Sequence, residues 1–189
     1  GEKEVGKKFM TIANDFVYRN NFDYSHLIEI SRLRERMEIE LAKEETNGKN
    51  VKLGYGGIAD IEFTIQTLQL THGKKNPRLR QANTIESIKM FVVHGIIDQA
   101  EAVLVKDNYL FLRKLECALR IIRRTPTNYL PKEKIELAQL ARFMSYSGND
   151  PDIIANALLN DYEKHTNKMR KYYRKTIGQL LRTGRSSSF

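Results

Sequence analysis

The chain has 189 residues, of which 41% are hydrophobic and 29% are charged, and its formal net charge is +9. This length suits one domain with a sizeable core, or two very small ones. No apolar run approaches the roughly 20 residues that a membrane-spanning helix needs, and the first ten residues lack the apolar core of a secretory signal. We therefore expect a cytoplasmic protein with no membrane partner. The single cysteine excludes an intrachain disulfide and a cysteine-based zinc site.

The positive charge is concentrated towards the C-terminus. No Asp or Glu follows Glu163, whereas eight Lys and Arg residues do, so the first 163 residues carry a net charge of only +1. The tyrosines among these cations would suit a helix that binds nucleic acid. The chain holds no recognised nucleic-acid-binding motif, however, and its remainder is nearly neutral. We therefore expect a solvated face or a contact with an acidic neighbour rather than nucleic acid, and a basic helical nucleic-acid-binding module is kept as an alternative.

Helical patterns predominate along the chain, and no alternating run of β-branched residues predicts a strand. The expected helices cover about residues 5–19, 24–45, 58–71, 84–94, 98–124, 131–144 and 151–182. We expect an all-α protein, an irregular bundle of about six to eight helices that forms one domain over residues 1–182. The tail at 183–189 is expected to be disordered. Because Gly1 stands in place of an initiating methionine, we expect this chain to be a piece of a longer one.

The segment 24–45 shows one amphipathic pattern. Its apolar side chains recur at steps of three or four residues and predict one stripe on a helix. They are Leu27, Ile30, Leu33, Met37 and Leu41. The other face is dense in charge and includes Arg34 and Glu38, which we expect on the outside.

The one glycine-rich stretch, residues 51–57, leads directly into the expected helix at 58–71. Its candidate site residues, together with one acid of the first helical turn, are Lys52, Gly54, Gly56, Gly57 and Asp60. Such a loop can bind anions through free N–H groups at a helix N-terminus, and Lys52 would assist. Asp60 would repel a phosphate unless a metal or a basic partner intervened, and the Gly-Lys-Ser/Thr of a P-loop is missing. From the residues alone, a tight turn that lets the helix pack closely is the better interpretation.

The helix at 58–71 is apolar on more than one side, which predicts a central, buried position. Asp60 and Glu62 point about 200° apart on it and are not expected to grip one metal ion. Glu62 instead starts a polar stripe, and a half-buried carboxylate needs a partner such as Arg113 or Arg120. We expect a structural polar network of Glu62, Gln66, Gln69, Arg113 and Glu116. The four histidines are scattered, so no metal site is expected.

Taken in order, these motifs resemble a known family. The stretch KLGYGGIADIEFTIQTLQLTHG, followed by NPRLRQANT, YLFLRKLECALR and YLP, is similar to the bacterial glutamine synthetase adenylyltransferase/deadenylylating enzymes over about residues 31–146. The resemblance implies a parent enzyme of nitrogen regulation with two halves, each a nucleotidyltransferase domain followed by a helical domain. One half would transfer AMP from ATP to glutamine synthetase and the other would remove it, with Mg²⁺ as cofactor and control by the PII protein and glutamine.

The chain departs from the complete enzyme in one respect. The family's catalytic signature, a Gly-Ser followed by paired aspartates, is missing, so no catalytic residue carries over and we expect this helical domain alone to be inactive. The resemblance implies that it walls the cleft of its own nucleotidyltransferase domain, with the segment from Lys52 to Glu62 nearest the nucleotide, and helps to dock glutamine synthetase or PII. The stretch LRERMEIEL favours the C-terminal, adenylylating half. The helical domain of PII uridylyltransferases is the alternative.

Overall fold

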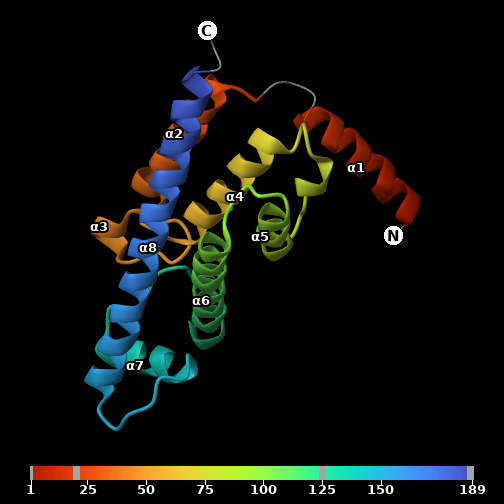
Figure 1. The fold of residues 1–189 in the computed structure, drawn as a ribbon. Helices are drawn as coiled ribbons and strands as arrows, with labels where there is room; N and C mark the ends of the chain where they lie inside the picture. The colour runs from red at the N-terminus through yellow and green to blue at the C-terminus, as the bar shows by residue number, and fades with distance from the viewer. Residues whose placement is uncertain (1, 19–21, 124–126, 187–189) are drawn as a thin grey trace.

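The computed structural model describes residues 2–18, 22–123 and 127–186, and this part of the chain is all-α (Figure 1). In chain order its elements are α1 (Lys3–Tyr18), α2 (Tyr24–Arg36), the π-helix η1 (Met37–Ala42), α3 (Glu44–Asn47), α4 (Ile58–His72), the 3-10 helix η2 (Pro77–Leu79), α5 (Thr84–Val93), α6 (Gln99–Arg123), α7 (Lys134–Phe143) and α8 (Pro151–Ser186). The described residues form no strand, although Asn50 and Tyr129 make an isolated antiparallel bridge. The expected all-α bundle is confirmed. No described helix combines the length and the apolar character that crossing a bilayer requires.

Side-chain caps fix where several helices begin. The side-chain oxygen of Asn83 accepts the N–H groups of Ile85 and Glu86 at the start of α5. Asp98 accepts the N–H group of Glu101 at 2.7 Å before α6, and Asp150 caps α8 in the same way. The N–H groups in the first turn of a helix have no backbone acceptor within that helix. At these three positions an Asn or Asp side chain supplies the acceptor.

The last helix is longer than the sequence indicates. α8 continues to Ser186, whereas its end was expected at Arg182 and the residues from 183 onwards were expected to be disordered. Residues 187–189 of that expected tail lie outside the described residues, as do the expected helix ends at 19 and 124. The four extra residues hold no proline to stop the helix, and the Thr183 hydroxyl donates to the carbonyls of Gln179 and Leu180.

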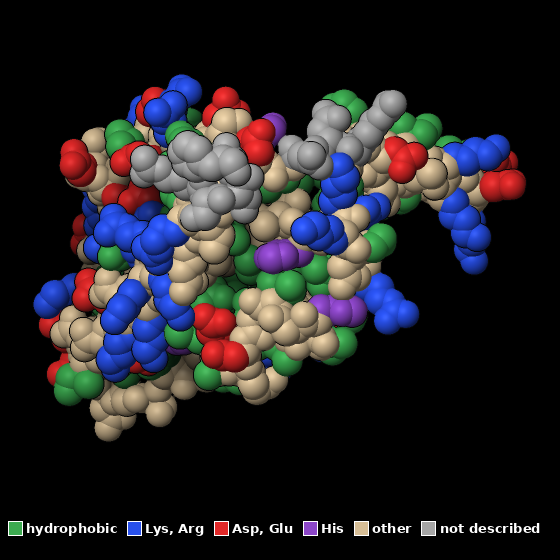
Figure 2. All heavy atoms as spheres, turned by 45° about the horizontal axis from the view of Figure 1, so that its top comes forward, with side chains coloured by type: hydrophobic (Ala, Val, Ile, Leu, Met, Phe, Trp, Pro, Cys, Tyr) green, Lys and Arg blue, Asp and Glu red, His purple; other side chains and the backbone are tan. Residues whose placement is uncertain are grey.

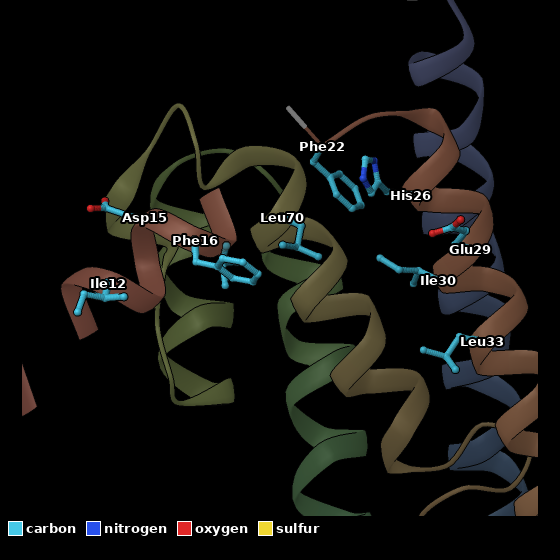
Figure 3. A pocket seen from close by; sticks show the side chains of 10 residues that line it. Ile12, Asp15, Phe16, Phe22, His26, Glu29, Ile30, Leu33 and Leu70 are labelled. Atoms are coloured by element: carbon cyan, nitrogen blue, oxygen red, sulfur yellow. The ribbon is translucent and has the colours of Figure 1, made fainter. Parts of the chain in front are cut away.

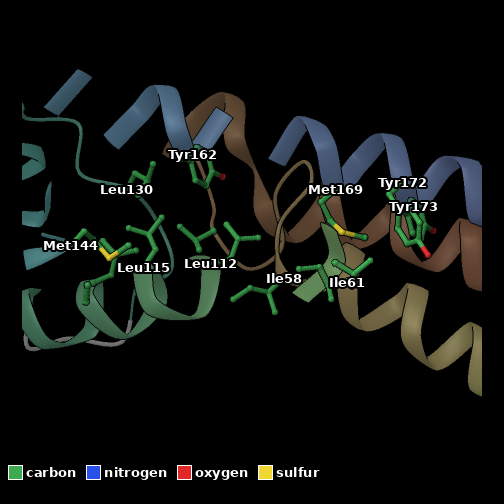
Figure 4. Close-up of a cluster of buried hydrophobic side chains, with 14 of the residues drawn as sticks. Ile58, Ile61, Leu112, Leu115, Leu130, Met144, Tyr162, Met169, Tyr172 and Tyr173 are labelled. Carbon is green, nitrogen blue, oxygen red and sulfur yellow. The ribbon is translucent and has the colours of Figure 1, made fainter. Parts of the chain in front are cut away.

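α4 and α8 organise the core. α8 runs along the molecule and packs against α2, α4, α6 and α7 (Figure 1). α4 is buried on most sides, as its all-round apolar sequence predicts. The apolar side chains that meet between α4, α6 and α8 include Ile58, Ile61, Leu112, Leu115, Tyr162 and Met169 (Figure 4). Burial of such side chains stabilises a fold by roughly 1.5–3 kcal/mol each.

The segment 24–45 is not the single amphipathic helix that its pattern predicts. It divides into α2, η1 and α3, with Lys43 in the left-handed region at φ 43°. Leu33 and Leu41 are 50% and 57% exposed, whereas Arg34, expected on the outer face, is completely buried. The predicted orientation was wrong for Arg34, Leu33 and Leu41, because α2 turns Arg34 towards a buried carboxylate of α4. Leu27 of the stripe is buried as expected.

Two leucines of α6 test the position of the core. Leu112 is fully buried and Leu110 is 48% exposed. We expect Leu112→Ala to lower the free energy of unfolding by about 2–5 kcal/mol, because it removes apolar contacts and leaves a cavity. Leu110→Ala, the same change two residues away, should cost less than about 1 kcal/mol. Urea unfolding followed by circular dichroism measures both, and equal losses would contradict the arrangement.

Candidate functional site

The loop before α4 satisfies the N-terminus of that helix with its own backbone. The Ile58 N–H donates to the Val51 carbonyl at 3.1 Å, and the Ala59 N–H donates to the Lys52 carbonyl at 2.9 Å. The first turn of a helix binds anions through N–H groups that are otherwise unpaired. Here the loop carbonyls already accept two of those N–H groups.

The glycines of this loop are required by close approach of backbone. Gly56 has φ +65°, and a Cβ atom there would lie 1.9 Å from the Thr166 carbonyl oxygen of α8. A Cβ atom at Gly54 would lie 2.5 Å from the Asn50 carbonyl oxygen, and one at Gly57 would meet the loop backbone at 2.7 Å. The loop therefore packs directly against α8, which agrees with the tight-turn interpretation of its sequence.

A group of two arginines and two carboxylates joins α2, η1, α4 and α8, and three of its four members are buried while Glu38 is half-buried. The Arg34 Nε donates to Asp60 Oδ1 at 2.6 Å, and the Arg170 Nε lies 3.1 Å from Asp60 Oδ2. Glu38 completes the group, with its Oε2 3.3 Å from the Arg34 Nη1 and in contact with the Arg170 guanidinium. We call these four residues the buried ion cluster. Its formal charges cancel, as charges removed from water must if the fold is to tolerate them.

The ion cluster also holds the glycine-rich loop. The Arg34 Nη2 donates to the Gly54 carbonyl at 2.8 Å. The guanidinium of Arg170 lies 4.7 Å from the centre of the Tyr55 ring, within the range of a cation–π contact. Burial raises the pKa of the Asp60 carboxyl, while the positive charges of Arg34 and Arg170 act in the opposite direction. The cluster therefore fixes the loop to both neighbouring helices.

The candidate loop residues occupy different environments. Gly54, Gly56, Gly57 and Asp60 are buried, and Lys52 is partly exposed. The sequence interpretation overlooked Arg34, Glu38 and Arg170, which it placed on the outside or among the cations of the last helix. One signal was available, since Arg34 follows Leu27 by seven residues and so shares its face of α2.

A second polar group links α4 to α6. Glu116 is buried, and its two oxygens accept from Arg113 and Arg120, each at 2.8 Å. Arg113 also reaches Glu62 of α4, with 3.4 Å between Nη2 and Oε1. Hydrogen bonds to the Tyr109 hydroxyl and to Glu116 raise the pKa of Arg113 above its usual value. The sequence-predicted residues Glu62, Arg113 and Glu116 therefore lie together in the structure.

The two glutamines of the expected network have different surroundings. Gln69 is buried, and its Nε2 lies 3.0 Å from the Leu79 carbonyl and 2.7 Å from the Gln81 carbonyl, so it holds the turn between α4 and α5. Gln66 is exposed. Together with Glu62 and Arg113, both glutamines line a polar cavity of about 270 Å³ between α4, α5 and α6.

The described residues do not provide a metal centre. They contain no group of three or more His, Cys, Asp and Glu side chains that could hold a metal ion. The buried Asp60 and the half-buried Glu38 already pair with guanidinium groups. Mg²⁺ prefers several oxygen ligands in octahedral geometry, and this part of the chain offers no such set.

The chain is similar to one protein family model and to several curated proteins that share a name. A family model described as GlnD PII-uridylyltransferase matches residues 29–177. A bifunctional glutamine synthetase adenylyltransferase/adenylyl-removing enzyme of Xanthobacter autotrophicus is 30% identical over 84% of this chain and 16% of that protein. The enzyme of the same name from Rhizobium meliloti is 32% identical over 84% of this chain and 16% of its own length. The Mycobacterium tuberculosis enzyme is 30% identical over 96% of this chain and 18% of its own length. The chain thus spans less than a fifth of these relatives.

The ion cluster can be tested with two arginines of α2. Arg34→Gln leaves the buried Asp60 with one cation fewer, and we expect a loss of about 3–5 kcal/mol in the free energy of unfolding. Arg36→Gln, which removes only the exposed pair with Glu40, should cost less than about 1 kcal/mol. Urea unfolding at neutral pH separates the two, and a small effect of Arg34→Gln would argue against a buried cluster.

Two glycines with the same backbone conformation test the packing of the loop. Gly95 has φ +67° and open space around it, whereas Gly56 at φ +65° faces the backbone of α8. Gly95→Ala should cost about 1–2 kcal/mol through conformational strain alone. Gly56→Ala adds a clash with Thr166, and we expect a further loss of about 1–3 kcal/mol or more. Thermal unfolding of both variants checks this order, and equal melting points would contradict it.

Proposed function

Because the chain belongs to the GlnD PII-uridylyltransferase family, we propose that it is the helical domain of an enzyme that adenylylates and deadenylylates glutamine synthetase. The observation that carries this proposal is the shared name of the relatives, one of which matches 96% of this chain. The parent would be a nucleotidyltransferase that transfers AMP from ATP. This chain would supply the helical scaffold beside the catalytic domain.

In this proposal the chemistry belongs to a domain outside this chain. ATP and Mg²⁺ would bind to that catalytic domain, since the described residues include no set of ligands that fits the metal. We derive no catalytic step for this chain. The isolated chain should therefore be inactive, and its contribution would be to shape and rigidify one wall of the catalytic cleft.

The glycine-rich loop is a candidate for the surface that meets the catalytic domain. Lys52, Leu53 and Tyr55 are its residues that reach the surface, while the buried glycines and Asp60 hold the loop in place. Lys52 is a cation on a rigid support, which suits contact with a phosphate group of a nucleotide held by the neighbour. In this proposal Asp60 acts as a positioning residue, because it contacts Arg34 and Arg170 and not solvent.

Glutamine synthetase and PII are the proposed partners of the parent enzyme. A helical domain of a PII uridylyltransferase is the second candidate, and the description of the matching family model favours it. The names of the relatives favour the adenylyltransferase. The two candidates differ in the protein that each enzyme modifies, so binding distinguishes them.

We expect the isolated chain to bind glutamine synthetase in a biolayer interferometry experiment, and to transfer no label to it from labelled ATP. A Lys52→Glu variant should bind glutamine synthetase as the natural chain does. In this proposal the side chain of Lys52 contacts the neighbouring catalytic domain and not the substrate protein. Binding to PII and not to glutamine synthetase would support the uridylyltransferase instead. Transfer of label by the isolated chain would contradict the assignment of catalysis to another domain.

A further inference from the structure

Two grooves on the described part of the molecule differ in the charge of their linings. α1 projects from the body of the molecule (Figures 1 and 2), and the groove between α1 and α2 is lined mainly by apolar side chains such as Phe16, Ile30 and Leu70 (Figure 3). A lining of this kind accepts apolar surfaces of many sorts and does not identify a partner. The groove between α6 and α8, of about 640 Å³, has charges of opposite sign on its two walls.

The α8 wall of this second groove carries lysines. Steps of four, three and four residues place a line of exposed lysines on one side of the helix. They are Lys164, Lys168, Lys171 and Lys175. The first and the last of them pair with carboxylates at 3.1 and 3.0 Å. Within the described part of the chain, Lys168 and Lys171 pair with no carboxylate, so this wall offers two uncompensated positive charges.

The α6 wall carries carboxylates, and the space between the walls is apolar. The acids that line the groove are Asp98, Glu101 and Asp107. Its apolar lining residues are Ala100, Val103, Leu104 and Tyr172. Val103 is 48% exposed, Leu104 is half-buried and Tyr172 is buried. The groove therefore has an apolar centre between a positive and a negative wall.

Contacts between α6 and α8 hold this groove in a fixed shape. The Lys175 Nζ lies 3.0 Å from the Glu101 Oε1 at one end. At the other end the His165 Nδ1 lies 2.8 Å from the Asn108 Oδ1, and the His165 ring stacks on Phe111 with 4.0 Å between the ring centres. These pairs show that the two helices run antiparallel, and they enclose about 15 Å of each helix, or three turns. A groove that is already formed needs little ordering to accept a partner.

We propose that the groove between α6 and α8 binds an amphipathic helix of a partner protein. Its apolar face lies against Val103, Leu104 and Tyr172, as in other helix-in-groove contacts. Carboxylates along one flank of the partner helix face Lys168 and Lys171. Basic or neutral side chains along the other flank face the α6 wall. This inference does not depend on the proposed function.

The same charges argue against a nucleic acid in this groove. Phosphate groups beside the lysines of α8 would also lie close to Asp98, Glu101 and Asp107 on the facing wall, and like charges repel. A phosphate backbone would also leave the apolar centre without a complementary surface. A helix with an apolar face and two flanks of opposite charge matches all three parts of the groove.

The binding of a designed peptide to the whole chain tests the proposal by fluorescence anisotropy. The peptide is an amphipathic helix of about five turns, with Leu at steps of three and four residues, Glu along one flank and Lys along the other. Lys168→Glu and Lys171→Glu together should weaken its binding about 10-fold, because two attractive pairs turn repulsive. Lys106→Glu, at an exposed lysine of α6 that does not line the groove, should leave binding unchanged.

Two apolar positions of α6 with the same exposure test the centre of the groove. Val103 lines it and Leu110 does not, and both are 48% exposed. Val103→Glu should weaken peptide binding by at least about 5-fold, since it places a carboxylate against the apolar face of the peptide. Leu110→Glu should not change it. Because all the substituted side chains are exposed, circular dichroism should show unchanged folding.

A second peptide, with Lys in place of Glu on the first flank, tests the charge of the α8 wall. It should bind the natural chain about 10-fold more weakly than the first peptide does, and it should bind the Lys168→Glu, Lys171→Glu chain more tightly than the natural chain. Dissociation constants above about 1 mM for both peptides, or equal constants for the two on the natural chain, would overturn the proposal. Binding of a single-stranded oligonucleotide that the two lysine variants weaken and Val103→Glu leaves unchanged would overturn it in favour of nucleic acid.

Discussion

The structure depends on the burial of Arg34, Asp60 and Arg170 between helices that are far apart in the sequence, with the half-buried Glu38 beside them. Asp60 lies in the first turn of the central helix with no exposed surface, and an isolated buried carboxylate would be very costly. Arg34 and Arg170 approach it from α2 and α8, and Glu38 balances the second positive charge. Because each charge requires the others, α2, α4 and α8 have one arrangement in which all four are paired. A buried ion cluster of this kind favours a specific packing more than it adds stability.

The glycine-rich loop is best understood as part of this arrangement. Its carbonyls accept the first N–H groups of α4, Arg34 holds its Gly54 carbonyl, and Gly56 lets its backbone touch α8. Gly54, Gly56 and Asp60, which carry the family resemblance, therefore stabilise the packing of this domain. The same rigidity suits the proposed function, since a catalytic neighbour gains from a wall whose surface residues, such as Lys52, are held in fixed positions.

The candidate surfaces of this domain lie on different parts of the molecule. The loop that we assign to the catalytic neighbour lies between α2, α4 and α8, whereas the exposed apolar side chains Val5, Phe9, Ile12 and Phe16 belong to α1. The polar cavity lined by Glu62 and Arg113 lies between α4, α5 and α6. A helical scaffold can present several such surfaces because its core, built on α4 and α8, is continuous beneath them.

The sequence by itself determined the all-α class and the central position of α4, and it indicated that Glu62 needs a cation from Arg113 or Arg120. These follow from local periodicity and from the need of a half-buried carboxylate for a cation. The tertiary structure alone decided that α2 buries Arg34 and exposes Leu33, and that Arg170 turns inward. A local pattern cannot show this, because the orientation of α2 is set by a carboxylate 26 residues further along the chain and completed by an arginine more than a hundred residues beyond that.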